Sequence, residues 1–283
     1  LKLGIHFLGI RIKNNFIKYN HKKIDGWCSQ NALILINRIS ELQHQLGIEG
    51  SLIEVGVHHG RLFTLLSLLS TDKEQCVAYD LFDNQSNNVD NSGLGDKTKL
   101  IENLKFNKCN FDNINIIEQD SNDLNKENVL DITKNQKSRI FSIDGGHTYN
   151  TVYNDIALAH KVLINGGIIV ADDYFNPTFP EVSEAIYNYL KESNELIPIC
   201  IIDSKLILTN SKQYYKSYLN YIKQLNLEFI IIKRKFLNID ILVLKSSKSD
   251  FINFFRKSKF WQNIKMSRVG NILRRNIKKL IKK

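Results

Sequence analysis

The sequence predicts an α/β fold, with a mostly parallel sheet, an antiparallel closing hairpin and helices on both faces. Short apolar, β-branched runs alternate with stretches of helical periodicity, the pattern of strands joined by right-handed crossovers. Several of these runs end in an acid, as at Asp80 and Asp144. Two later runs, 196–202 and 206–209, are separated by only three residues, which indicates a hairpin.

The first half of the chain predicts three strands and their helices. Residues 32–46 repeat apolar side chains at helical spacing and stop at Gly47, a helix-end signal. The run 51–60 is a short buried strand that enters a glycine turn, and 62–69 opens the next helix. Further strands are expected at 75–80 and 115–121, with helical segments at 97–106 and 122–132.

The second half completes the sheet. Strands are expected at 139–144 and 167–172, followed by the hairpin, and helices at 150–163, 182–190 and 214–225. A second short hairpin is expected at 229–232 and 239–244, but the sequence does not fix its place in the sheet. We expect a lead-in segment at 1–26, one main domain at 27–245 and a basic tail at 246–283.

Composition favours a globular protein of a reducing compartment. The chain has 283 residues, 43% hydrophobic and 10% aromatic, with three prolines. Its four cysteines lie far apart in the sequence, without a C-x-x-C pair, which predicts free thiols in the cytoplasm. No apolar run reaches the roughly 18 residues of a membrane span.

The net charge of +10 is concentrated at the C-terminus. Residues 245–283 hold thirteen Lys or Arg and one acid, so residues 1–244 carry a charge of about −2. A near-neutral body argues against nucleic-acid binding. The tail also spaces aromatic and aliphatic residues helically, which suits peripheral contact with the inner face of an anionic membrane. Packing on a partner subunit, as in a homo-oligomer, and a loose basic tail are the alternatives.

The most informative block joins two acid-terminated runs. Residues 141–149 read FSIDGGHTY, with Asp144 and His147, and 166–174 read GGIIVADDY, with Asp172 and Asp173. Neighbouring parallel strands would bring these acids to one sheet edge, where ligands bind. Three carboxylates and an imidazole there could hold a divalent cation and supply a base. The plain alternative is a helix-capping acid pair beside a polar loop histidine.

A second set of residues resembles class I S-adenosylmethionine-dependent methyltransferases, which have a Rossmann-like sheet. The resemblance covers roughly residues 27–210. It is carried by a glycine turn after the first strand and by acids after the next two strands: Glu54-x-Gly56-x-x-x-Gly60, Asp80 and Asp120-Ser121. His58 stands where the family's middle glycine is usual, which makes the turn bulkier.

The resemblance implies S-adenosyl-L-methionine as the cofactor. The glycine turn, with Glu54, Gly56, Val57 and Gly60, would approach its methionine part. A carboxylate at Asp80 would accept the ribose hydroxyls, and Asp120 and Ser121 would meet the adenine edge. Asp144 would lie near the cofactor's amino group.

The block at 141–174 also resembles a narrower branch, the macrocin-type sugar O-methyltransferases and their relatives in polysaccharide biosynthesis. In that branch, acids at the positions of Asp144, Asp172 and Asp173 bind Mg²⁺, and sugar hydroxyls approach the metal. Macrocin-type enzymes have Asp-Gly-Asp where this chain has Asp-Gly-Gly-His147. We therefore assign His147 as the general base, with Asp144 also in the catalytic group.

These residues predict an S-adenosylmethionine-dependent O-methyltransferase that acts, with metal assistance, on a sugar hydroxyl of a glycan or glycoconjugate. The alternatives are a methyltransferase of small natural products or catechol-like acceptors, and a non-catalytic module, which His58 favours.

The polar segment 80–96 is either a lid over the acceptor or a surface loop. Trp27 is read as a packing anchor, or as a residue folded over the cleft. Residues 176–182 are expected to form a wall beside the acceptor.

Overall fold

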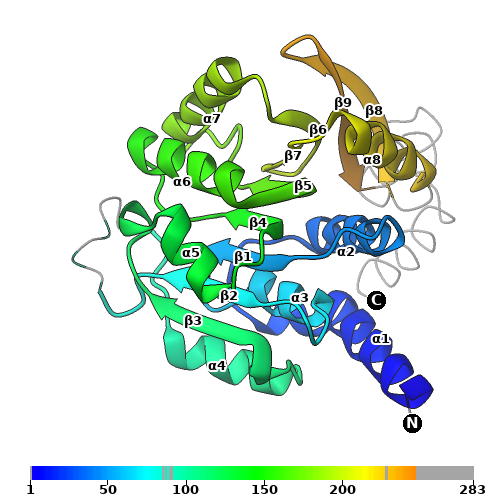
Figure 1. The fold of residues 1–283 in the computed structure, drawn as a ribbon, viewed down its shortest axis with the longest axis vertical. Coiled ribbons are helices and arrows are strands. Elements are labelled where there is room, and N and C mark those ends of the chain that lie inside the picture. Colours follow the sequence, from blue (N-terminus) through cyan, green and yellow to red (C-terminus); the bar gives the residue numbers. More distant parts are fainter. Residues whose placement is uncertain (1, 85, 87, 89–91, 227–228, 247–283) are drawn as a thin grey trace, which may run out of the picture.

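The computed structural model describes residues 2–84, 86, 88, 92–226 and 229–246, with no side chains before residue 9. The basic tail and its predicted amphipathic helix lie outside these residues. In the described part, nine strands form one sheet (Figure 1). The strands are β1 (Ser51–Val55), β2 (Cys76–Asp80), β3 (Ile114–Glu118), β4 (Ser138–Ile143), β5 (Leu163–Ala171), β6 (Ile197–Ile202), β7 (Lys205–Thr209), β8 (Phe229–Phe236) and β9 (Ile239–Ser246).

The sheet confirms the predicted fold class. Its strand order is β3-β2-β1-β4-β5-β7-β6-β9-β8, and Figure 1 shows this row from β3 to β8. The five strands from β3 to β5 are parallel, and the β6–β7 hairpin adds to β5 in antiparallel orientation. The second hairpin extends the same edge, because β9 pairs in parallel with β6 and β8 pairs with β9.

The helices lie close to their predicted positions. They are α1 (Lys2–Lys18), α2 (Gln30–Gln45), α3 (Arg61–Leu69), α4 (Lys97–Phe106), α5 (Lys126–Ile132), α6 (Tyr149–Val162), α7 (Pro180–Ser193) and α8 (Lys212–Gln224). Helix α1 had no counterpart in the prediction. The strand expected at 115–121 ends at Glu118, so Asp120 precedes and Ser121 begins a 3-10 turn, Ser121–Asp123. None of the described helices has the length and apolarity needed to cross a bilayer.

Helix starts follow from side chains that cap exposed backbone amides. The Ser29 hydroxyl accepts a hydrogen bond from the Ala32 amide at the start of α2, and Thr148 does the same for Thr151 at the start of α6. Helix α7 opens with Pro180, whose missing amide costs nothing at a first helical position. The Thr148 cap and Pro180 mark where α6 and α7 begin, after the segments that follow β4 and β5.

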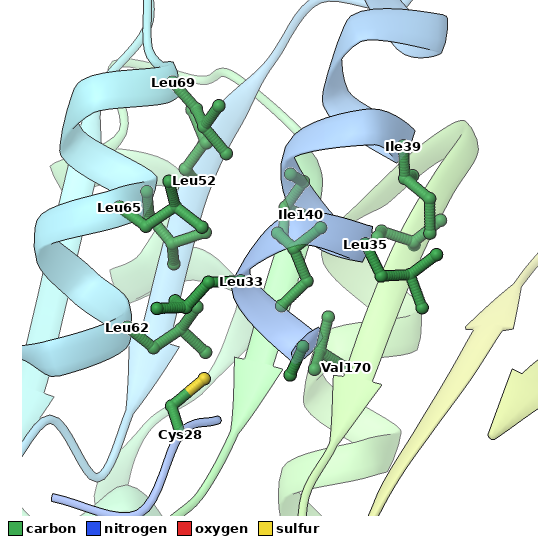
Figure 2. Close-up of a cluster of buried hydrophobic side chains, with 14 of the residues drawn as sticks. Cys28, Leu33, Leu35, Ile39, Leu52, Leu62, Leu65, Leu69, Ile140 and Val170 are labelled. Atoms are coloured by element: carbon green, nitrogen blue, oxygen red, sulfur yellow. The ribbon is translucent and has the colours of Figure 1, made fainter. Parts of the chain in front are cut away.

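Two apolar layers hold the helices on the sheet. One face packs against α1 to α4 and α8, and the other against α5 to α7. Figure 2 shows part of the first layer, in which side chains of α2 and α3 meet strand residues Leu52, Ile140 and Val170. Phe16 and Ile24 are buried in the same layer, so the expected lead-in segment contributes to this core.

The strand order places a crevice at the carboxyl ends of β1 and β4. Chain connections leave these neighbouring strands in opposite directions across the sheet, the arrangement at which open α/β sheets bind ligands. The backbone pairing continues past the strands, since the Asp144 amide donates to the Val55 carbonyl and the Asp172 amide to the Ile143 carbonyl. The acids that follow β4 and β5 are thereby held side by side.

Candidate active site

A cleft of about 610 Å³ opens at the carboxyl edge of the sheet. Its lining includes eight of the residues that the sequence singled out: Gly56, Asp80, Asp120, Ser121, Asp144, His147, Asp172 and Asp173. Each follows the end of a parallel strand, as predicted. The juxtaposition is therefore a consequence of strand order, although it does not by itself test the role assigned to each residue.

Three predicted cofactor residues do not line this cleft. Glu54 is buried on the sheet face that α2 and α3 cover, because Val55, its neighbour in the strand, takes the opposite face. Val57 is also buried in that apolar layer. Gly60 begins α3 with φ +83°, and a Cβ there would lie 2.3 Å from Leu100. These three positions therefore lie outside the lining of the cleft, and their role toward a cofactor stays a prediction.

Gly56 is required by the close approach of β1 and β4. Its φ is +79°, and a Cβ would lie 1.8 Å from the Asp144 carbonyl oxygen. His58, two residues on, also has a positive φ of 53°, which is uncommon for a non-glycine residue. Its amide donates to Asp80 Oδ2 over 2.7 Å. The substituted turn therefore remains tied to the acid at the end of β2.

Asp80 is placed to accept hydroxyl groups. Its carboxylate accepts the amides of His58 (2.7 Å) and Phe82 (2.9 Å), one on each oxygen. A carboxylate has about four lone-pair sites, so two further donors can be accommodated from the cleft. Burial raises the pKa of Asp80, against the effect of these backbone hydrogen bonds. The group fits the ribose diol that the sequence predicts.

The neighbouring strand supplies a second polar corner. Asp120 Oδ1 accepts the Asn122 amide at 2.9 Å, and the Asn122 side chain reaches Thr151 on α6 at 3.3 Å. Ser121 and Asn122 line the same part of the cleft. The hydroxyl and amide groups here match the donors and acceptors on the edge of a purine base. Asn122 and Thr151 were not predicted as site residues.

His147 is held on three sides. Its Nε2 lies 3.1 Å from Asp173 Oδ2, its Nδ1 lies 3.0 Å from Ser92 Oγ, and its ring stacks on Phe179 with centroids 3.7 Å apart. A carboxylate can only accept, so Nε2 carries the proton and Nδ1 accepts the Ser92 hydroxyl hydrogen. The basic nitrogen therefore faces a hydroxyl group at the cleft.

The acids expected to bind a metal already have protein partners. Asp172 Oδ1 accepts Ser204 Oγ and the Asp173 amide, both at 2.8 Å, while Oδ2 is paired with the ammonium of Lys205. Asp173 Oδ1 accepts Asn176 Nδ2 at 2.7 Å, and its Oδ2 faces His147. Lys205 Nζ also lies 3.8 Å from Asp144 Oδ2.

As placed, these acids do not fit the predicted Mg²⁺ site. Lys205, at the start of β7, has its positive charge between Asp144 and Asp172, where a shared cation would lie. In the described chain, the one group of three or more acids, histidines or cysteines whose ligand atoms all lie within 4.8 Å of one another is Asp25, His58 and His59. Asp144, Asp172 and Asp173 do not form such a group.

The acids around Lys205 differ in their pKa values, so some are charged and others are neutral. Burial alone would raise the pKa of Asp172, but Lys205 and the hydrogen bonds to the carboxylate outweigh it and lower the pKa to about 2. Burial and the neighbouring Asp172 charge raise the pKa of Asp144 well above its usual value. Burial, with Asp144 nearby, does the same to Glu54. Asp172 and Lys205 form the ion pair, and Glu54 and Asp144 favour the protonated form.

Several residues at the cleft were missed or misread from the sequence. Lys205 was read only as part of a hairpin turn, and Ser92 only as part of a polar loop. Trp27 is 77% exposed, lines the cleft and has its ring centroid 5.2 Å from that of His58, so the packing-anchor reading is wrong. Asn88, Ser92 and Gly93 also line the cleft, which favours the lid reading of their loop. Asn176 and Phe179 form part of the wall.

Comparison with known proteins locates this architecture among methyltransferases. Residues 53–174 match a family described as a methyltransferase domain. Among solved structures, the chain is similar to the O-methyltransferase NovP, with 14% identity, 65% of this chain and 81% of that chain covered, and a TM-score of 0.54. It is also similar to CalS11, a TDP-rhamnose 3'-O-methyltransferase, with 18% identity, 62% and 77% covered, and a TM-score of 0.47. No curated protein matches the sequence.

Proposed function

We propose that this chain methylates a sugar hydroxyl. Its residues 53–174 match a methyltransferase-domain family, and its sheet has the fold of class I S-adenosylmethionine-dependent methyltransferases. The fold and the enzyme class predicted from the sequence are confirmed. The acceptor is the proposed part. The observation that carries it is the His147 imidazole, fixed by Asp173 and turned toward a hydroxyl at the cleft.

The residues around the cleft fit S-adenosyl-L-methionine. Asp80 would receive the ribose hydroxyls, Asp120 and Ser121 the adenine edge, and the backbone at Gly56, which lines the cleft, the methionine part. When bound, the cofactor supplies a methyl group made electrophilic by a sulfonium. The cleft, at about 610 Å³, leaves room for an acceptor beside it.

His147 is suited to remove the acceptor proton. The Asp173 carboxylate holds the Nε2–H tautomer, which leaves the Nδ1 lone pair directed to the position of the Ser92 hydroxyl, 3.0 Å away. An acceptor hydroxyl that replaces Ser92 there would donate its proton to Nδ1 as the carbon–oxygen bond to the methyl group forms and the carbon–sulfur bond breaks, with that electron pair left on sulfur. Asp173 then stabilises the imidazolium, and stacking on Phe179 prevents the ring from rotating.

The lining favours an acceptor with many hydroxyl groups. Asn88, Ser92 and Asn176 make the side of the cleft beside His147 polar, and sugar hydroxyls would exchange with the hydrogen bonds that these groups make within the chain. The faces of Trp27 and Phe179 offer flat apolar surfaces against which a sugar ring can pack. These two aromatic faces also favour a second candidate, a planar natural product or catechol-like acceptor. The open cleft speaks against the non-catalytic alternative, because His58 does not fill it.

Methyl transfer from radiolabelled cofactor tests the proposal. The purified chain would be offered nucleotide sugars and short glycans in one series and catechol-like phenols in another. We expect label in a sugar, and His147→Ala should lower the rate by about 10²- to 10⁴-fold, the usual contribution of a general base. His160→Ala is the matched control, because His160 contacts Tyr189 on α7 instead of the cleft. Label only in phenols, or an unaltered rate in His147→Ala, would contradict the proposal.

A further inference from the structure

Lys205 is a buried cation at the centre of the acid cluster. The residue is 2% exposed, its ammonium is paired with Asp172 Oδ2, and it lies 3.8 Å from Asp144 Oδ2. We propose that Lys205 is the resident cation of this site, which occupies the place of a divalent metal and positions the base, so that methyl transfer needs no metal. This inference rests on the proposed function.

A metal ion at this site would need carboxylate oxygens that are free to bind it. Both oxygens of Asp172 and both of Asp173 are engaged by protein donors, which are Lys205, Ser204, Asn176, His147 and the Asp173 amide. Mg²⁺ binds carboxylate oxygens at about 2.0–2.1 Å in a near-octahedral shell. It would have to break these contacts and lie beside the ammonium. Like charges in a buried site oppose that exchange.

The ammonium is also a permanent charge. Burial would lower the pKa of Lys205, but Asp172 and Asp144 outweigh burial and raise it above the usual value. The ion pair with Asp172 thus places Lys205 in the cluster as a cation and not as a base. Cys28 and Glu54, which also lie near, favour their neutral protonated forms because burial raises the pKa of each, so neither competes with Asp172 for the ammonium.

A continuous set of contacts connects Lys205 to the base. Lys205 and Ser204 hold Asp172, Asp172 Oδ1 accepts the Asp173 amide, and Asp173 Oδ2 faces His147 Nε2. Asp173 has a φ of +53°, a sparsely populated conformation for a non-glycine residue, so these contacts are needed to keep it there. Lys205 is thus a positioning residue that acts through Asp172 and Asp173.

The first test is metal binding, read by the electron paramagnetic resonance signal of Mn²⁺ with the full chain. Mn²⁺ binding is measured with and without the change Asp172→Asn, and the difference is the binding at this site. Binding at the separate Asp25, His58 and His59 group is the same in both and cancels. We expect no such binding in the wild type. Lys205→Met keeps the stem of the side chain and removes the charge. Its affinity for Mn²⁺ at this site should exceed that of the wild type by at least about tenfold, the size of effect that neighbours of a metal site have on its affinity. Lys161→Met, an exposed change on α6, is the control.

The second test is activity, with EDTA and with added Mg²⁺. We expect the wild-type rate to be unchanged by either, and Lys205→Met to be slower and partly restored by Mg²⁺. Wild-type Mn²⁺ binding that Asp172→Asn removes, or wild-type activity lost in EDTA, would overturn the inference. Both wild-type measurements stand even if Lys205→Met does not fold. A wild type that methylates no sugar would contradict the proposed function instead, and the Mn²⁺ measurement would still decide the role of Lys205.

Discussion

Asp155 on α6 is a buried acid near the polar corner of the cleft. It is 1% exposed, neither carboxylate oxygen makes a hydrogen bond of normal geometry in the described part of the chain, and Ser121 lies near enough to favour the charged form. Oδ2 would lie 3.5 Å from a Cβ placed on Gly145, which lines the cleft. Burial raises the pKa of Asp155 to about 7. The folded protein therefore takes up a proton here that the unfolded chain does not hold at the same pH.

The buried Asp155 carboxyl makes the stability of the fold depend on pH. The folded pKa is raised, so the stabilisation is complete below the usual value of 3.8 and is lost as pH rises toward about 7. Asp155→Asn should therefore raise the melting temperature at pH 8, by the equivalent of up to about 4 kcal/mol, and change it little at pH 4. Thermal unfolding at both pH values measures this. Asp131→Asn, at an exposed position on α5, is the control. An equal effect at both pH values would contradict it.

The sequence predicted the acids of the site better than their partners. Asp144, Asp172 and Asp173 could be placed together because each directly follows a buried parallel strand, and such strands end at one edge. Lys205 could not be found in this way. Its ammonium reaches Asp172 only because β7 pairs with β5, a contact between distant segments that a local pattern does not specify. Glu54 lies in β1 itself, where alternation turns its side chain to the face that the helices cover, so its role toward the cofactor stays a prediction.

A buried ion pair ties β4 to the connection before β2. The Arg139 guanidinium contacts both Glu74 oxygens, at 2.6 and 3.1 Å, and also bonds to Ser40 and Gln43 on α2. Burial alone would raise the pKa of Glu74, but Arg139 and two backbone amides lower it. These contacts lie near the amino ends of the strands, away from the cleft.

Loss of one partner should therefore destabilise the fold without acting on the site. Arg139→Met leaves the Glu74 carboxylate buried without its cation, and we expect a loss of about 3–5 kcal/mol in the free energy of unfolding. Urea denaturation measures it. The double variant Arg139→Met/Glu74→Gln should regain part of the loss, because no unpaired charge remains. A double variant no more stable than Arg139→Met would count against this account.

Strands and helices with a clear period were predictable, and the place of the second hairpin in the sheet was not. The runs at 139–144 and 167–172 appear as β4 and β5, since buried parallel strands are continuously apolar. The hairpin β8–β9 was expected, but its partner was not. Strand β9 pairs with β6, and β7, α8 and β8 lie between these two strands in the sequence. The register of β9 therefore depends on tertiary packing. Helix α1 was overlooked because charged residues interrupt its apolar positions.

The sheet and the cleft are coupled through Asp80. This carboxylate ends β2, accepts the amides of the glycine turn and the following loop, and faces the cleft. A ligand held by Asp80 therefore stabilises β2, the turn after β1 and the loop together. Because a ligand that binds only the folded state stabilises it by mass action, the effect appears as a rise in melting temperature.

S-adenosylhomocysteine, the product form of the cofactor, measures this coupling independently of the acceptor. At about 100 times its Kd it should stabilise the wild type by about 2.7 kcal/mol. Asp80→Asn keeps the size of the side chain but removes the charge that ribose hydroxyls would meet, a loss of about 1.5–3 kcal/mol. Calorimetry should then show binding weakened by about ten- to a hundredfold. Asp83→Asn, an exposed acid three residues on, should bind as the wild type does. If both variants bound equally well, Asp80 would only hold the glycine turn, and another group would have to receive the ribose.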